Sequence, residues 1–178
     1  MTEPSLESKI NQFVARLEKL DAGDRARLRR NAGARRADAR GVESIFYRLV
    51  PPGLSDRQEE AFFLVATLFP LADGGSGGNI GQSLQRAAQK HPRMKKGIDR
   101  RIQILLDADL DQELPFHLRQ TVHFLKSCRV RLDWAVLLKD LLYWDHPDRF
   151  VQQSWARAYY APGLKLSVNQ KDYQPQNA

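Results

Sequence analysis

The sequence predicts an all-α protein, a helical bundle of about eight or nine helices arranged in two lobes, and three observations support this. Apolar residues recur at spacings of three and four along nearly the whole chain, which is the pattern of helices with one buried face. No stretch of any length alternates apolar and polar residues as a strand would. Helix-capping residues and prolines interrupt the apolar runs at intervals that suit short helices.

The first lobe, residues 1–72, is predicted to begin with two helices. Asp21 or Asp24 can cap the second helix, because a carboxylate there accepts a hydrogen bond from a backbone N–H that has no partner in the helix. This helix runs through an arginine-rich stretch, and Gly33 is expected to end it. The buried face of the first helix is expected to contain Ile10, Phe13, Val14, Leu17 and Leu20.

Two more helices complete the first lobe. Pro51 is expected to close a short third helix, because proline cannot continue one. Ser55 and Gln58 match a capping box, which opens the fourth helix. The expected buried residues are Ile45, Phe46 and Leu49 in the third helix, and Phe62, Val65, Ala66 and Phe69 in the fourth.

A glycine-rich stretch, DGGSGGN at residues 73–79, is predicted to form a flexible loop between the lobes. Five helices are expected in the second lobe, residues 80–161, with Asp133 capping the fourth and Pro147 opening the fifth. Residues 162–178 are expected to form a flexible tail. The expected buried residues, helix by helix, are Ile80, Leu84 and Ala88; Met94, Ile98, Ile102 and Leu105; Leu114, Leu118, Val122 and Leu125; Trp134, Leu137, Leu138, Leu141 and Leu142; and Phe150, Val151, Trp155 and Tyr159.

Positive charge is concentrated in three stretches of a chain whose net charge is +7. Residues 24–40 contain seven arginines, no lysine and two aspartates. Residues 86–101 contain seven cations and one aspartate, and residues 119–131 contain four cations and no acid. Charge segregated in this way creates a field that attracts an anionic partner.

The composition argues against several other classes of protein. Cys128 is the only cysteine, so neither a disulfide framework nor a thiolate metal site is predicted, and its apolar helical setting indicates a buried, inert thiol. No apolar run approaches the roughly 20 residues of a membrane span, and the N-terminus lacks the pattern of a signal peptide. We therefore expect a cytoplasmic protein with no membrane partner.

No active site is visible in the sequence. The glycine-rich loop is not followed by the lysine and hydroxyl residue of a phosphate loop. Asp145, His146 and Asp148 lie close in sequence, but consecutive residues at a helix start point in different directions. His117 and His123 are six residues apart, which does not place them on one face of a helix. We therefore predict that the protein is not an enzyme and needs no metal or cofactor.

The basic stretches predict contact with a nucleic-acid backbone, without readout of base sequence. Arginine grips phosphate through two parallel hydrogen bonds, and few solvent-facing aromatic residues are expected nearby to stack on bases. On the second helix, Arg27 and Arg30 project away from Leu28, whereas Arg25 and Arg29 flank its edge. The alternative is a solvated helix whose arginines pair with acids of the same chain, and it applies most to Arg25 and Arg29. The charge pattern contributes these candidate contacts: Arg27, Lys95, Lys96 and Arg131.

Six blocks of sequence also occur in an informative order between about Leu20 and Trp155. They are LDAGDRARLRR (20–30), FYRLVPP (46–52), GGNIGQSL (77–84), DRRIQILLDAD (99–109), HLRQTVHFL (117–125) and LDWAVLLKDLLYW (132–144). Together these blocks resemble the small, CasB-type subunit of the type I-E CRISPR Cascade complex, which carries a guide RNA and opens a matching DNA duplex.

The resemblance implies a helical, two-lobed, non-catalytic subunit that works with the other Cascade subunits and with a second copy of itself. The two copies would stabilise the R-loop by holding the displaced DNA strand and by bracing the hybrid of guide RNA and target strand. The basic contacts that the resemblance implies are Arg29, Arg30, Arg57, Arg100, Arg101 and Arg119.

Two other classes of function remain open. Short helices with a glycine turn in residues 20–50 are compatible with a helix-turn-helix DNA-binding regulator, although a recognition helix mixes Gln, Asn, Ser and Arg to read bases. A helical adaptor that binds only protein would use the same charges to match an acidic partner. Binding to unrelated single-stranded and double-stranded oligonucleotides separates these classes.

Overall fold

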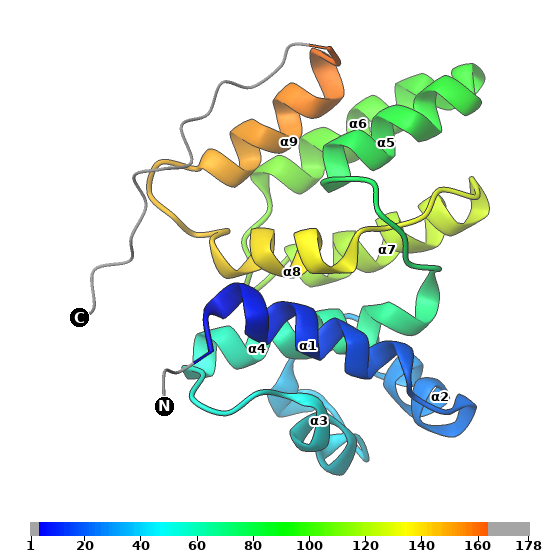
Figure 1. Ribbon diagram of the computed structural model, residues 1–178. Helices are drawn as coiled ribbons and strands as arrows, with labels where there is room; N and C mark the ends of the chain where they lie inside the picture. Colours follow the sequence, from blue (N-terminus) through cyan, green and yellow to red (C-terminus); the bar gives the residue numbers. More distant parts are fainter. Residues whose placement is uncertain (1–3, 164–178) are drawn as a thin grey trace.

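The computed structural model describes residues 4–163, and these residues form nine α-helices joined by loops and short 3-10 turns (Figure 1). Within this range the structure contains no β-strand, only an isolated bridge between Gly74 and Leu132. The all-α prediction is therefore confirmed. The helices are α1 (Leu6–Glu18), α2 (Ala22–Arg30), α3 (Glu43–Leu49), α4 (Asp56–Leu68), α5 (Ile80–Lys90), α6 (Lys95–Asp107), α7 (Leu114–Ser127), α8 (Trp134–Leu142) and α9 (Phe150–Tyr160).

The helices are stacked in layers. In Figure 1, α1 to α4 occupy one end of the molecule, α5, α6 and α9 occupy the other, and α7 and α8 lie between them. Helix α8 packs against α1 and α4, and α5 packs against α9. Apolar residues of all these helices join one continuous core. The helices before residues 73–79 therefore pack against the helices after them. The division of the chain into two lobes at that loop stays a prediction.

Local sequence signals fix where several helices begin. The Asp21 carboxylate accepts a hydrogen bond from the Asp24 backbone N–H at 2.8 Å, so Asp21 is the cap of α2. Ser55 and Gln58 form the predicted capping box at the start of α4, and Asp133 caps α8. These three predictions are confirmed because each depends on groups within one turn of chain.

Two predicted helix boundaries after the glycine-rich loop are wrong. Helix α9 begins at Phe150 and not at Pro147, because residues 145–149 form a turn that ends with Arg149 in the left-handed conformation (φ 50°). Met94 ends a 3-10 turn before α6 and is 50% exposed, so it does not join the buried face of that helix. Phe150 is likewise 41% exposed.

The glycine-rich loop at residues 73–79 is bonded to three other parts of the chain. Its Asp73 accepts from Lys126 of α7 at 2.9 Å, and Arg86 of α5 donates to the Gly77 carbonyl at 2.6 Å. Backbone bonds in both directions join the loop to Leu132. The loop therefore packs against the start of α8, where Trp134 is 2% exposed as predicted. Cys128 is also buried. Of the predicted tail, residues 164–178 lie outside the described residues.

Candidate nucleic-acid interface

Helix α2 carries arginines of two kinds. Leu28 is its one buried residue, and the side chains of Arg27, Arg29 and Arg30 are exposed with no hydrogen-bond or ion-pair partner among residues 4–163. Arg25 is different. Its guanidinium donates to the backbone carbonyls of Leu20 at 3.0 Å and Glu18 at 2.7 Å, so it fastens the start of α2 to the end of α1.

The loop after α2 also holds arginines that contact the chain itself. The Arg36 guanidinium pairs with Asp56, Glu59 and Glu60 of α4. The Arg40 guanidinium donates to the carbonyls of Ala37 and Ala39. Only Arg36 matches the alternative in which arginines pair with acids of the same chain. Arg40 binds carbonyls instead, and Arg29 has no such partner among residues 4–163.

The cations of α6 divide in a similar way. Lys95 pairs with Asp99 at 2.9 Å, and the Tyr159 hydroxyl donates to the same carboxylate at 2.6 Å. These two hydrogen bonds, with that of Tyr159 the stronger influence, lower the pKa of Asp99. Lys96 and Arg100 are exposed, and neither has a hydrogen-bond or ion-pair partner in the described part of the chain.

Arg101 lies half-buried between α6 and α7. Its guanidinium carbon is 4.8 Å from the centre of the Phe124 ring, which is a cation–π distance. Desolvation at this position lowers the pKa of Arg101. The Arg101 side chain therefore contributes to the packing of α6 on α7 as well as to the charge of the surface.

A groove of about 250 Å³ runs between α6 and α7. Arg100 and Arg101 line its α6 side, and His117 and Gln120 line its α7 side. Ile104, 37% exposed, adds an apolar surface. Charged, apolar and amide groups thus meet in one hollow.

The turn after α2 joins the arginine-rich helix to α7. Gly33 has φ +77°, and a Cβ atom there would lie 3.1 Å from the carbonyl oxygen of Pro115 and 3.4 Å from Cβ of Arg119. The turn therefore lies against the first half of α7, with Arg119 exposed beside it. One residue further along α7, Gln120 lines the groove that Arg100 shares. We call these exposed cations the α2–α7–α6 basic surface: Arg27, Arg29, Arg30, Lys96, Arg100 and Arg119.

Two predicted contacts lie apart from this surface. Arg57, near the start of α4, pairs with Asp145 in the connection between α8 and α9. In Figure 1 that connection is on the opposite side of the molecule from the connection between α5 and α6. Arg131 is exposed beyond the end of α7, where its side chain packs against Gly75 of the glycine-rich loop.

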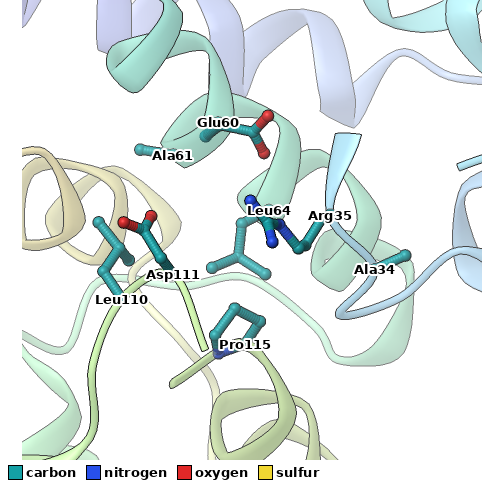
Figure 2. Close-up of a pocket in the computed structure, with 8 residues that line it drawn as sticks. All are labelled: Ala34, Arg35, Glu60, Ala61, Leu64, Leu110, Asp111 and Pro115. Carbon is teal, nitrogen blue, oxygen red and sulfur yellow. The ribbon is translucent and has the colours of Figure 1, made fainter. Parts of the chain in front are cut away.

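A small pocket lies where the turn after α2 meets α4 and the loop before α7 (Figure 2). Its volume of about 70 Å³ is well below the roughly 300–1,000 Å³ of small-molecule sites. Figure 2 shows the guanidinium of Arg35 and the carboxylates of Glu60 and Asp111 around the hollow. Within residues 4–163, no three His, Cys, Asp or Glu side chains are grouped to hold a metal ion, and no helix is long and apolar enough to cross a membrane.

Sequence reasoning missed three residues of this region. Phe116 on α7 is 55% exposed, although few exposed aromatic residues were expected near the basic stretches. The signal was available, because Phe116 falls off the buried stripe that starts at Leu114 and continues through Leu118. Gln120 and Gly97 line the groove, and only the packing of α6 on α7 reveals that position.

The fold and this surface define a class: an all-α protein with an exposed basic face. A family model of the CRISPR-associated protein Cse2 matches residues 24–160, and the chain belongs to this family. A Cse2 protein from Thermus thermophilus is 39% identical over 120 residues, which is 66% of this chain and 68% of the relative.

Solved structures agree with this assignment. A Cse2-family protein from Thermus thermophilus has a TM-score of 0.73 at 31% identity, covering 88% of this chain and 99% of the other. CasB from M. ruber has a TM-score of 0.71 at 29% identity, covering 89% and 94%. A chain of a CRISPR RNA-guided surveillance complex has a TM-score of 0.76 at 27% identity, covering 87% and 93%.

Proposed function

We propose that this chain is a non-catalytic subunit of a CRISPR surveillance complex and that its α2–α7–α6 basic surface holds nucleic-acid backbone there. Family membership and the similarity to a chain of an RNA-guided surveillance complex support the first part. The observation that carries the second is the exposure of cations on α2, α6 and α7, none of them bound to an acid in the described part of the chain, together with the packing of the turn after α2 against α7.

The chemistry of these cations suits phosphate. Arginine presents a planar fork that binds two phosphate oxygens at once, and such contacts position a strand without carrying sequence information. Sequence-independent binding is what an R-loop requires, because the same subunit must accept every target. Opening a duplex against a guide RNA is a nearly balanced exchange, so contacts to backbone can shift it.

Within the complex, the surface would hold the displaced DNA strand and brace the hybrid of guide RNA and target strand. Its partners would be the other Cascade subunits and a second copy of this chain. The six cations provide enough charge, since several phosphate contacts give nonspecific dissociation constants of roughly 10⁻⁴–10⁻⁶ M at physiological salt.

The test is the salt dependence of binding to single-stranded DNA of unrelated sequences. Wild-type protein is expected to bind all of them with similar, weak affinity, and log K should fall with log salt at a slope of about −0.7 per phosphate neutralised. Arg30→Ala and Arg100→Ala should each make the slope shallower. Arg157→Ala is the control, because Arg157 is an exposed arginine of α9 outside the basic surface.

Each rival function has its own outcome in this assay. Strong preference for one duplex sequence would identify a DNA-binding regulator. Absence of any nucleic-acid binding at low salt would identify an adaptor that binds only protein.

In a reconstituted complex, the two arginine variants should shorten the lifetime of the R-loop more than they slow initial target recognition, because they act on strand that is already displaced.

A further inference from the structure

One exposed face of α7 combines an aromatic ring with polar groups in the middle of the basic surface. Phe116, Arg119, Gln120 and His123 follow the spacing i, i+3, i+4 and i+7, so they share one side of the helix. All four are exposed. Phe116 is 55% exposed and packs edge-on against His117, with ring centres 5.3 Å apart. Its ring thus stands beside the groove that His117 lines.

The groove itself has features that phosphate binding alone does not require. Ile104 presents an apolar side chain in it, and Gln120 brings an amide that can donate and accept hydrogen bonds. A solvated phosphate gains nothing from contact with isoleucine or phenylalanine. A nucleobase does gain, because its flat face stacks on apolar and aromatic groups while its edge bonds to polar ones.

Gly97 is a second, independent observation. It lies in the first turn of α6 and lines the groove, and glycine weakens a helix relative to alanine. No atom outside the adjacent helix backbone lies within 4 Å of the position that a Cβ would take. Packing inside the protein therefore does not demand glycine here. Close approach of a ligand to the backbone is one of the situations that does.

We infer that Phe116 and the α6–α7 groove bind unpaired bases of a single strand whose phosphates are held by Arg119 on one side and Arg100 on the other. This inference rests on the proposed function and adds to it. A base must be unpaired to offer its face to Phe116, so the site favours single-stranded over double-stranded nucleic acid. Every base has such a face, so stacking adds affinity without choosing a sequence.

The experiment compares two DNA strands of equal length and charge, oligothymidine and the same strand with abasic residues. Wild-type protein should bind oligothymidine about tenfold more tightly, which is the scale of one stacked base. Phe116→Ala should remove most of that difference and leave the salt slope unchanged, since no cation is lost. Phe116→Tyr should restore it. Phe150→Ala is the matched control, because Phe150 is an exposed phenylalanine in α9.

A second variant tests the groove without removing any side-chain contact. Gly97→Leu fills the hollow, and it should lower affinity for oligothymidine more than for the abasic strand. The inference is overturned if wild-type protein binds both strands equally, or if Phe116→Ala and Gly97→Leu both keep the wild-type preference. The proposed function fails separately, when Arg30→Ala and Arg100→Ala leave the binding of both strands and its salt slope unchanged.

Discussion

In α2 and the loop that follows it, the arginines that contact the chain bind oxygen atoms: Arg25 and Arg40 bind backbone carbonyls, and Arg36 binds carboxylates. The arginines of this region without such a contact, Arg27, Arg29 and Arg30, are exposed on α2. In α6, Arg101 lies over the ring of Phe124, just as Arg25 of α2 lies over the ring of Phe69. What separates the two regions is the groove with apolar and amide groups, which Arg100, a free cation of α6, lines.

This difference separates two kinds of contact on one surface. Under the proposed function, the α2 region binds phosphate, and its contribution to binding should depend on salt. Under the further inference, the α6 region binds both phosphate and base, and the contribution of base stacking should not depend on salt. The comparison also shows that counting the cations of a sequence stretch overestimates how many are available to a ligand. In each stretch, some cations support the fold and others face solvent.

The largest effect should come from breaking the support under the α2 region. Trp134 is buried, its ring centre is 5.5 Å from that of Phe69, and the Arg25 guanidinium lies 5.4 Å from the Phe69 ring. Trp134→Ala should lower the free energy of unfolding by about 3–5 kcal/mol, because it leaves a large cavity. Urea denaturation measures this loss.

The Trp134 indole N–H is buried without a partner in the described structure, so Trp134→Phe should cost distinctly less. Equal midpoints for Trp134→Ala and wild type would contradict the predicted support.

A charge outside both regions tests whether stability and binding can be separated. Burial raises the pKa of Asp140 in α8 to about 7, although the indole of Trp155 donates to its carboxylate at 2.6 Å. Between about pH 4 and 7 the folded state therefore holds a proton that the unfolded state has lost, so stability falls as pH rises, by at most about 1.4 kcal/mol per unit. Asp140→Asn keeps an acceptor for Trp155 and should remove this part of the decline.

The measurement is the difference in unfolding free energy between the two proteins at pH 5 and at pH 8. The stability of Asp140→Asn relative to wild type should be greater at pH 8 than at pH 5. At each pH, the two proteins should bind single-stranded DNA with the same affinity. A difference that is constant with pH would show that Asp140 titrates normally in the folded state.

The sequence could predict these features to different extents. The caps at Asp21, Ser55 and Asp133 depend on neighbouring groups, and the sequence predicted Ser55 and Asp133 outright and Asp21 as one of two candidates. The start of α9 was not predicted, because Arg149 adopts the left-handed conformation and its guanidinium donates to the Leu106 carbonyl of α6, a tertiary contact that Pro147 does not reveal. The basic surface was predicted only as separate stretches. What joins them is the contact between the turn at Gly33 and α7, which depends on tertiary packing.

A neighbouring pair of arginines on α2 should separate support from binding. Arg25→Ala removes two hydrogen bonds from a charged group to backbone carbonyls, and it should cost about 1–2 kcal/mol of stability. Arg27→Ala removes an exposed side chain and should stay within about 0.5 kcal/mol. Binding should show the reverse order, with a shallower salt slope for Arg27→Ala only. The same loss of stability in both variants would show that Arg27 also supports the fold.

The smallest expected effect distinguishes two adjacent lysines at the start of α6. Lys95 is paired with Asp99, whereas Lys96 is exposed with no partner among the residues described. Replacing Lys95 alone would leave the Asp99 charge to repel phosphate, so the fair variant is the double change Lys95→Gln with Asp99→Asn, which keeps the net charge and an acceptor for Tyr159. This double variant should lose at most about 0.5 kcal/mol of stability, as expected for an exposed helical ion pair, and should keep the wild-type salt slope. Lys96→Gln should make the slope shallower by up to about 0.7, the value for one phosphate on a single strand. A changed slope for the double variant, together with an unchanged slope for Lys96→Gln, would mean that Lys95 separates from Asp99 and binds phosphate. The division of α6 into paired and free cations would then be wrong at this position.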